Sequence, residues 1–516
     1  MELKPGYKRS EVGVIPESWS LRPLGEVVAF LDGRGAHHRT RRRPKNSPGA
    51  RYGAEHSVLS LPDPFQIGKG MNGVGQPERA TQNRVIALFR DELRYRYLGD
   101  WSDHDGNSNV EEGLLTKYLA SSGYSSAQIG MALYKLRTEA DNHSRSLYDN
   151  NKAVYGLLRY GVPVKTEAGK VTETIHLINW QEPEKNDFAI AEEVTLYGNH
   201  ERRPDLVLYV NGIAVGVLEL KCSRISIGDG IRQNLSNQQP EFNQWFFSTI
   251  QFIFAGNDSE GLQYGTIGTP EKYFLRWKED EQDNTRFKLD KYLLKMCRKD
   301  RLIELMHDFV LFDGGIKKLP RVHQYFGIKA AQQHVRDRSG GIIWHTQGSG
   351  KSIVMVLLAK WILENNPNAR VAIITDRDEL DKQIEQVFTD AGEAIKRSNS
   401  GRDLLKQLGE AKPRLLCSLV HKFGKKDVDD FEAFIKELEG QPSQTVGEVF
   451  VFVDECHRTQ SGNALETVTL LALFTFSNSA KAPSSPLCSS SISAMRAVTL
   501  SSSVSRSVMA SISAAK

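Results

Sequence analysis

The 516-residue chain lacks the features that mark membrane, exported and disulfide-stabilised proteins. It has no run of about 18 apolar residues, the length a bilayer-spanning helix needs, and no apolar signal-peptide core near its start. Its five cysteines form neither a CxxC pair nor a metal-binding spacing, so they are expected to be free thiols in a reducing compartment. These absences predict a soluble, cytoplasmic protein without a membrane partner.

A strong excess of charge of either sign is also missing. Lysine and arginine number 67 against 63 aspartates and glutamates, a net charge of +4. Such a weakly basic balance suits a polyanionic partner without identifying one. The length exceeds the roughly 250–300 residues that one hydrophobic core organises, so two or three domains are expected.

The two ends of the chain differ in composition from the middle. Residues 7–24 are expected to form a small ordered segment, whereas the basic run at 37–45 lies among Gly, Pro and Ser and favours a solvated linker over a phosphate-binding segment. From residue 477 to 516, Ser and Ala dominate, and large apolar side chains are too few to offset the entropy lost on ordering. We therefore expect largely disordered ends.

Two helices are expected early in the globular part. Residues 76–90 place apolar side chains at helical spacing. Asn109 is expected to cap a second helix, with Glu112 as its capping-box partner. Residues 279–285 are charged and poor in apolar side chains, which predicts a loop.

The sharpest chemical pattern before the glycine-rich loop is Arg-Pro-Asp ending at Asp205, then two strands joined by Asn-Gly, then Glu219-Leu-Lys221. Two carboxylates hold a hard divalent cation such as Mg²⁺ through oxygen, and the cation polarises a phosphate and activates bound water. Lys221 would orient that water or stabilise developing negative charge. The pattern predicts phosphodiester cleavage with Asp205 and Glu219 as metal ligands. The alternative, that these residues are only the solvent face of an amphipathic hairpin, stays open.

The turn between the two strands decides whether these side chains meet. A two-residue Asn-Gly turn pairs Val210 with Ile213 and places Asp205 on the face away from Glu219. A three-residue loop with a glycine bulge pairs Tyr209 with Ile213 and brings the two carboxylates to one face. We predict the bulged register, because the two-residue turn excludes the metal site unless another distortion restores it.

The wording around this pattern, RRPDLVLYVNGIAVGVLELK, resembles the PD-(D/E)xK nucleases and, within them, the nuclease domain of type I restriction enzyme R subunits. The resemblance implies that Gln233 lies on a helix beside the site and helps hold the scissile phosphate. This branch often has a tyrosine four residues later, where the chain has Asn237. Some relatives carry an additional acid on an early helix, for which Glu111 or Glu112 is a candidate.

A second motif, HTQGSGKS at 345–352, follows an apolar strand at 341–344 and precedes a helix expected over 353–363. In such a loop, backbone N–H groups and the helix N-terminus hold phosphates. Lys351 would reach the β and γ phosphates and Ser352 would ligate Mg²⁺. The residues expected to bind ATP here are Thr346, Gly348, Ser349, Gly350, Lys351 and Ser352.

A β-branched and aromatic run at 449–453 is typical of a buried parallel strand and ends in Asp454-Glu455. TQGSGKS and DECH resemble motifs I and II of superfamily 2 helicases. By that resemblance Asp454 would hold Mg²⁺, Glu455 would polarise the attacking water, and Gln324 would read adenine. HTQGSGKS, ITDRDELDKQI (with a strand at 371–375) and VFVDECHRTQSG together resemble the motor domain of type I R subunits.

The predicted fold class is α/β, a PD-(D/E)xK nuclease domain followed by one RecA-like parallel-sheet lobe. The expected segments are 1–70, a basic linker after a stretch (1–31) resembling the start of a type I specificity subunit; 71–278, the endonuclease domain; 279–310, a connector; 311–462, the ATP-binding lobe; and 463–516, a tail that reads as out-of-frame translation.

The resemblance implies a restriction subunit of a type I restriction-modification system that cleaves unmodified double-stranded DNA with Mg²⁺, coupled in the family to ATP-driven translocation. Its partners would be double-stranded DNA and the methylation and specificity subunits. The sequence shows no second RecA-like lobe with its completing arginines, so we expect ATP hydrolysis and translocation to be lost in this chain. Two alternatives stay open: a repair helicase–nuclease, and an inactive DNA- or ATP-binding remnant.

Overall fold

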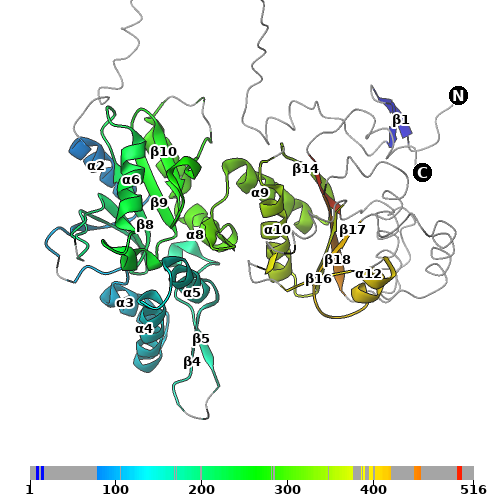
Figure 1. Cartoon of the computed structure of the whole chain (residues 1–516), viewed down its shortest axis with the longest axis horizontal. Coiled ribbons are helices and arrows are strands. Elements are labelled where there is room, and N and C mark those ends of the chain that lie inside the picture. Colours follow the sequence, from blue (N-terminus) through cyan, green and yellow to red (C-terminus); the bar gives the residue numbers. More distant parts are fainter. Residues whose placement is uncertain are drawn as a thin grey trace, which may run out of the picture.

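The computed structural model describes residues 7–10, 13–16, 78–104, 106–167, 169, 171–197, 200–279, 282, 285–346, 348–375, 385, 388–389, 394–398, 401–419, 447–454 and 497–501. Two bodies of mixed α/β structure follow one another along the chain (Figure 1). The first carries a seven-stranded mixed sheet and the second a six-stranded parallel sheet. Within the described ranges, no helix is both long and apolar enough to cross a membrane.

The first sheet has the strand order β11-β10-β9-β8-β7-β6-β3. Its β6–β7–β8 and β9–β10–β11 steps are antiparallel, whereas β8–β9 and β3–β6 are parallel. The strands are β3 (Arg96–Asp100), β6 (Phe188–Glu192), β7 (Leu206–Val210), β8 (Ile213–Leu220), β9 (Phe252–Asn257), β10 (Gly261–Gly265) and β11 (Leu275–Arg276).

The central strands of this sheet are buried on both faces. Every residue of β7 and β8 is buried. One face of β7 places Leu206 and Leu208 in the main hydrophobic cluster, while the other places Val207 and Tyr209 in a second cluster. Burial on both faces explains why the sequences of these strands are nearly continuous apolar runs and do not alternate between apolar and polar residues.

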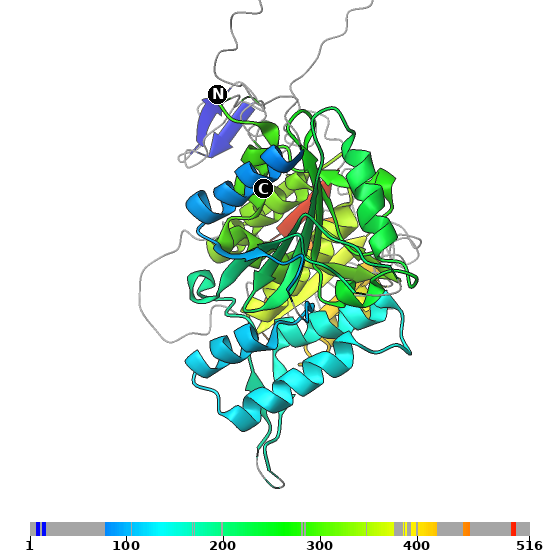
Figure 2. The same ribbon diagram turned by 90° about the vertical axis from the view of Figure 1, so that its left-hand side faces the viewer.

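Helices cover this sheet, and α3 to α5, drawn in cyan, gather below it in Figure 2. The elements are α2 (Glu78–Ala87), the π-helical turn η2 (Leu88–Glu92), α3 (Glu112–Ser121), α4 (Ser126–Ala140), α5 (Leu147–Tyr160), the hairpin β4 (Val162–Val164) and β5 (Glu173–Ile175), the 3₁₀ turns η3 (Pro183–Lys185), η4 (Gln244–Ser248) and η5 (Glu271–Tyr273), and α6 (Ile227–Asn237). The helix expected over 76–90 is confirmed by α2 and η2.

The predicted capping box at the start of α3 is wrong. The N-cap of this helix is Glu111. Asn109 lies two residues before this cap, and its amide nitrogen donates to Trp245 O and Ser248 Oγ, both at 3.0 Å. Glu112 instead pairs with Arg137 of α4 at 2.8 Å. The Glu112 side chain, which the local pattern assigned to the capping box, therefore makes a tertiary contact instead.

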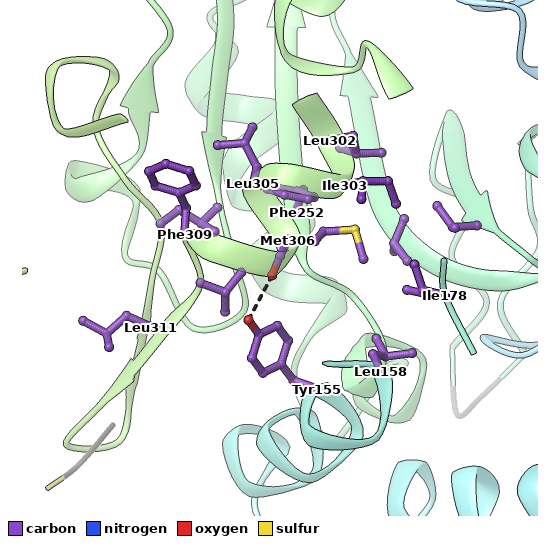
Figure 3. Packing of buried hydrophobic residues seen from close by; sticks show 14 of the residues in the cluster. Tyr155, Leu158, Ile178, Phe252, Leu302, Ile303, Leu305, Met306, Phe309 and Leu311 are labelled. Carbon is purple, nitrogen blue, oxygen red and sulfur yellow. Dashed lines mark hydrogen bonds between the residues drawn. The ribbon is translucent and has the colours of Figure 1, made fainter. Parts of the chain in front are cut away.

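Residues 279–310, expected to be a connector, contain two helices, α7 (Lys288–Met296) and α8 (Lys299–Asp308). Helix α8 supplies Leu302, Ile303 and Met306 to the main hydrophobic cluster (Figure 3). The Tyr155 hydroxyl of α5 donates to Met306 O at 2.9 Å. The described part of this segment is thus packed into the first body.

The second body begins with the hairpin β12 (Leu311–Asp313) and β13 (Ile316–Lys318) and with α9 (Val322–Arg336). Its parallel sheet has the order β14-β19-β18-β15-β17-β16. The elements are β14 (Gly341–Trp344), α10 (Lys351–Asn365), β15 (Ala369–Thr375), β16 (Ile395–Arg397), α12 (Gly401–Leu408), β17 (Leu415–Leu419), β18 (Glu448–Asp454) and β19 (Ala497–Ser501). The strands predicted at 341–344, 371–375 and 449–453 are confirmed, and α10 includes the helix predicted at 353–363.

The expectation of disordered ends is wrong for one short segment, which lies in the Ser/Ala-rich tail. Near the start, β1 (Tyr7–Ser10) and β2 (Gly13–Pro16) form an antiparallel hairpin, as expected of a small ordered segment. In the Ser/Ala-rich tail, β19 pairs in parallel with β14 and with β18. A strand between two others is held by backbone hydrogen bonds on both sides, a gain that an argument from side-chain composition leaves out.

The two bodies share one continuous hydrophobic cluster, which runs from Val85 of α2 to Phe452 of β18. Polar contacts also join them. Arg159 of α5 pairs with Glu364 of α10, and the Tyr264 hydroxyl of β10 donates to Pro320 O at 2.6 Å. Helix α10 is therefore attached directly to the first body.

Candidate functional site

The β7–β8 turn is a two-residue turn, so the predicted three-residue loop is wrong. Val210 pairs with Ile213, and the two turn residues Asn211 and Gly212 have φ values of 55° and 82°. Both lie in the left-handed region, as a type I′ turn requires. The buried Asn211 side chain stabilises this conformation, because it accepts from Asp187 N at 2.7 Å and donates to Leu177 O at 2.9 Å.

A bulge farther along the hairpin restores the register that the metal site needs. Tyr209 pairs with Ala214, but Leu208 pairs with Gly216, which leaves Val215 as the extra residue on β8. A bulge shifts the following side chains to the opposite face of the strand. Beyond it Leu206 pairs with Leu218, so Asp205 comes opposite Glu219. The predicted convergence is confirmed, although the distortion that produces it is not the predicted one.

The three predicted side chains lie together at the end of the hairpin away from the turn. Asp205 Oδ2 accepts a hydrogen bond from Leu220 N at 2.6 Å. Lys221 Nζ lies 3.9 Å from Glu219 Oε2. Glu219 is fully buried and the Lys221 side chain is only 11% exposed. The alternative that these residues form the solvent face of a hairpin is therefore excluded.

Burial controls the protonation of this cluster. Burial raises the pKa of Asp205 to about 6, against the lowering effects of the Leu220 N–H and Lys221. Burial, reinforced by the charge of Asp205, raises the pKa of Glu219 well above its ordinary value. Burial alone would lower the pKa of Lys221, but the carboxyl groups of Asp205, Glu219 and Glu78 outweigh it and the pKa is raised. Lys221 is thus cationic beside two carboxyls that resist ionisation.

The donor set suits a hard divalent cation. Both Glu219 oxygens are buried and have no hydrogen bond to the described residues, and the ammonium of Lys221 stays 3.9 Å away. A buried carboxyl without hydrogen bonds is costly unless something binds it. Carboxylate oxygens are the ligands that Mg²⁺ prefers. In the part of the chain that the structure describes, no three His, Cys, Asp or Glu side chains are grouped as a metal site. Any cation held here would therefore need main-chain carbonyls or water besides Asp205 and Glu219.

Helix α2 brings a third acid that the sequence analysis missed. Glu78 Oε1 lies 3.1 Å from Lys221 Nζ, although the two residues are 143 positions apart. One turn later, Gln82 is buried and contacts Asp205 O. An acid at the first residue of a helix fits the helix dipole equally well, so nothing local marked Glu78. The burial of Gln82 four positions later marks this face of α2, but only the structure shows it.

The two acids that the sequence analysis proposed instead lie elsewhere. Glu111 N donates to Gly212 O at 2.8 Å, which places Glu111 at the turn, the end of the hairpin opposite Asp205. Its carboxyl accepts from Ser108 N at 3.0 Å, and burial raises its pKa. Glu112 pairs with Arg137 on the far side of α3. Neither is a site residue.

Helix α6 packs directly over the carboxylates. A Cβ added at Gly230 would lie 3.4 Å from Glu219 Cβ and 3.6 Å from Lys221 Cγ, so a glycine here lets the helix approach closely. Gln233 is one turn farther along and is half-buried. Asn237, at the position often occupied by tyrosine, is buried, and its amide atoms have no hydrogen-bond partner among the described residues.

The second predicted site lies at the start of α10. Gly348 and Gly350 adopt left-handed φ values of 75° and 84°, conformations that glycine adopts at little cost. Lys351 and Ser352 are the first two residues of the helix. Thr346 is exposed, whereas Ser349 is buried. A strand, a glycine loop and a helix N-terminus thus follow one another, the order that phosphate-binding loops have.

Gln324 contacts the loop itself. Its Nε2 donates to Ser349 O at 2.9 Å and to Gly350 O at 3.2 Å, and its Oε1 accepts from Arg321 N at 2.8 Å. The side chain is 2% exposed. In this conformation the Gln324 amide holds the glycine loop against the start of α9. The role predicted for it, reading adenine, would require those contacts to change.

Asp454 ends β18 at the same edge of the parallel sheet as the glycine loop. Trp344, which precedes the loop, pairs with Ser501 of β19, and Asp454 pairs with the adjacent Leu500. The ends of β14 and β18 are therefore level and one strand apart, about 10 Å. Glu455, Gln347 and residues 376–384 lie outside the described residues, as do most of 1–77 and 455–516.

Comparisons with known proteins agree with the order of the two bodies. Residues 75–272 match the family model described as "Type I restriction enzyme R protein N terminus", and residues 323–476 match that of the SWI2/SNF2 ATPase. The second match extends past residue 462, where the sequence analysis ended the lobe.

Individual relatives are similar over the same region. The type I restriction enzyme HindI endonuclease subunit of Haemophilus influenzae is 28% identical over 60% of the chain and 32% of its own length. The SsaAORF53P endonuclease subunit of Staphylococcus saprophyticus is 24% identical over 54% of the chain and 30% of its own length. The chain thus spans about a third of the curated relatives that it matches.

A solved structure is also similar, the UvsW helicase from bacteriophage T4, at 19% identity over 40% of this chain and 60% of that one. Its TM-score of 0.26 is too low to inform the fold further. By the two family models and the named endonuclease subunits, the chain is similar to the R proteins of type I restriction enzymes.

Proposed function

We propose that the chain is the DNA-cleaving subunit of a type I restriction-modification system, with a PD-(D/E)xK endonuclease site formed by Asp205, Glu219 and Lys221. The observation that carries the proposal is the meeting of half-buried Asp205 and fully buried Glu219 beside a cationic lysine, with no hydrogen bond to either Glu219 oxygen among the described residues. The similarity to endonuclease subunits supports unmodified double-stranded DNA as the substrate.

Each side chain has a distinct role in this proposal. A divalent cation such as Mg²⁺, held by Asp205 and Glu219, would polarise the scissile phosphate and activate water. Lys221 keeps its charge and lies 3.9 Å from Glu219 Oε2, where it would stabilise negative charge on the phosphate. Glu78 shares the Lys221 ammonium at 3.1 Å and so fixes its direction. Gln233, on the helix packed over the site, is proposed to orient the phosphate.

The second body is proposed to bind ATP with Mg²⁺. Backbone N–H groups at Gly348 and Gly350, with Lys351, would hold the phosphates. Ser352 and Asp454 would hold the cation, because both lie at the edge of the sheet where the glycine loop begins. As in the type I family that the chain resembles, ATP would drive DNA translocation, and the methylation and specificity subunits would select the target.

Nicking of plasmid DNA by the purified chain, with and without Mg²⁺, tests the nuclease proposal. Asp205→Asn and Lys221→Ala are each expected to reduce Mg²⁺-dependent nicking by at least a hundredfold. Asp300→Asn is the matched control, because its carboxyl is 56% exposed on α8 and pairs only locally with Arg298. Unchanged nicking by Asp205→Asn, or none by the unmutated chain at any Mg²⁺ concentration, contradicts the proposal.

A further inference from the structure

Gln82 of α2 donates to three oxygens that converge beside the proposed nuclease site. Its Nε2 lies 3.2 Å from Glu192 Oε2, 3.0 Å from Glu193 Oε1 and 3.3 Å from Asp205 O. The residue is 3% exposed. The two hydrogens of this amide group are thus shared among three acceptors. A helix does not need these contacts to form, and a buried apolar side chain would pack in the same place without them.

The acceptors belong to a strained segment. Glu193, the residue after β6, has a φ of 50°, and its N–H donates to the same Asp205 O at 3.1 Å. A left-handed conformation at a residue other than glycine persists only where the surroundings hold it in place. Gln82 binds both sides of this contact, the Glu193 carboxylate and the Asp205 carbonyl.

Other donors cannot replace the amide. Arg79 Nη1 reaches Glu192 Oε2 at 2.7 Å and Glu193 Oε1 at 3.7 Å, and the Tyr97 hydroxyl also donates to Glu192. Among the contacts that the structure describes, the carbonyl of Asp205 receives side-chain donation from Gln82 alone. Without that amide, the Asp205 carbonyl and the carboxylates of Glu192 and Glu193 would together lose one hydrogen-bond donor.

The same helix carries Glu78, four residues earlier and on the same face. Gln82 therefore links the backbone of one carboxylate residue to the helix that directs Lys221. We propose that Gln82 is a positioning residue for the nuclease site: it fixes the main chain of Asp205 and the start of α2, so that the Asp205 carboxylate is preorganised for a divalent cation. This inference rests on the proposed nuclease function.

The test is direct titration of the whole chain with Mn²⁺, a stand-in for Mg²⁺ that also takes oxygen ligands. The relevant binding event is the one that Asp205→Asn removes. Gln82→Met keeps the length and burial of the side chain but loses its donor, and removal of such supporting contacts weakens metal binding by about 10–100-fold. Thermal unfolding of the metal-free variant is recorded in parallel, because a purely structural residue would change that and not the Mn²⁺ affinity.

Gln332→Met is the matched control. Gln332 is also a buried helical glutamine, 1% exposed, and lies on α9 of the second body. We expect its Mn²⁺ affinity to equal that of the unmutated chain. Should Gln82→Met fail to fold, Gln82→Leu, a smaller apolar side chain that also has no donor, is measured in its place with the same expected weakening.

The proposal is overturned if the Gln82 variant binds Mn²⁺ as tightly as the unmutated chain, or if the Gln332 variant is weakened equally. A different result would contradict the nuclease proposal itself. If the unmutated chain has no Mn²⁺ site that Asp205→Asn removes, the nuclease proposal fails, and the role of Gln82 fails with it.

Discussion

Replacing Asp205 by asparagine should stabilise the metal-free protein at neutral pH. Burial raises the pKa of this carboxyl from 3.8 to about 6. Each pKa unit corresponds to about 1.4 kcal/mol, so ionised Asp205 costs the folded state about 3 kcal/mol at neutral pH. Asparagine has the same shape, its carbonyl can still accept the Leu220 N–H, and it carries no charge to desolvate.

The sign of the pH dependence follows from the direction of the shift. Between about pH 4 and about pH 6 the folded state retains the Asp205 proton while the unfolded chain has lost it, so the contribution of Asp205 to stability falls as pH rises through this window. The free energy of unfolding of Asp205→Asn minus that of the unmutated chain should be near zero at about pH 4 and reach about 3 kcal/mol above about pH 6.5.

Urea unfolding in the presence of a chelator, at a series of pH values, measures this difference. Asp300→Asn serves as the control of opposite sign: burial opposes the shift, but the Arg298 guanidinium prevails and lowers the pKa of Asp300, so its loss brings no gain at neutral pH. A difference for Asp205→Asn that is negative at neutral pH, or that does not vary with pH, would refute the reasoning from burial.

Three further predictions concern the rest of the fold. Lys351→Ala should abolish binding of a fluorescent ATP analogue and leave Mn²⁺ binding at the nuclease site unchanged; loss of both would show that the two sites are not separate. Glu364→Ala should lower the free energy of unfolding by about 3 kcal/mol, because it leaves the buried Arg159 guanidinium without its carboxylate; urea unfolding checks this, and a loss below about 1 kcal/mol would contradict it. Gly212→Ala should cost about 2–4 kcal/mol in the same assay, because the new Cβ would lie 2.7 Å from Leu114 Cβ at a positive φ; a neutral effect would show that the turn can adjust.

The hairpin shows what sequence reasoning could and could not predict. The strands, the convergence of Asp205 with Glu219 and the need for a register distortion all followed from the period-two geometry of strands. The position of the distortion did not, because Asn211 makes tertiary contacts to Leu177 and Asp187 that favour the two-residue turn. The bulge falls at Val215 instead, where Gln251 N donates to the Val215 carbonyl at 2.8 Å.

Residues brought from distant parts of the chain were the main omission. Glu78 and Gln82 precede Asp205 by more than a hundred positions, and no spacing rule connects them to it. Glu111 and Glu112 were chosen instead because they open a helix, yet that helix packs at the turn end of the hairpin. In contrast, the strand, loop and helix at 341–365 are contiguous, and there the local pattern predicted the strand at 341–344 and a helix after the loop, which begins two residues earlier and ends two residues later than expected.

An anomalous difference map from a crystal of the chain soaked in Mn²⁺ tests the central claim most directly, because it depends on neither partner subunits nor ATP. We predict a peak between the carboxylates of Asp205 and Glu219, beside the Lys221 ammonium, that disappears in Asp205→Asn. A map without density at these carboxylates, with Mn²⁺ bound elsewhere or not at all, would contradict the assignment of this cluster as a metal-dependent nuclease site.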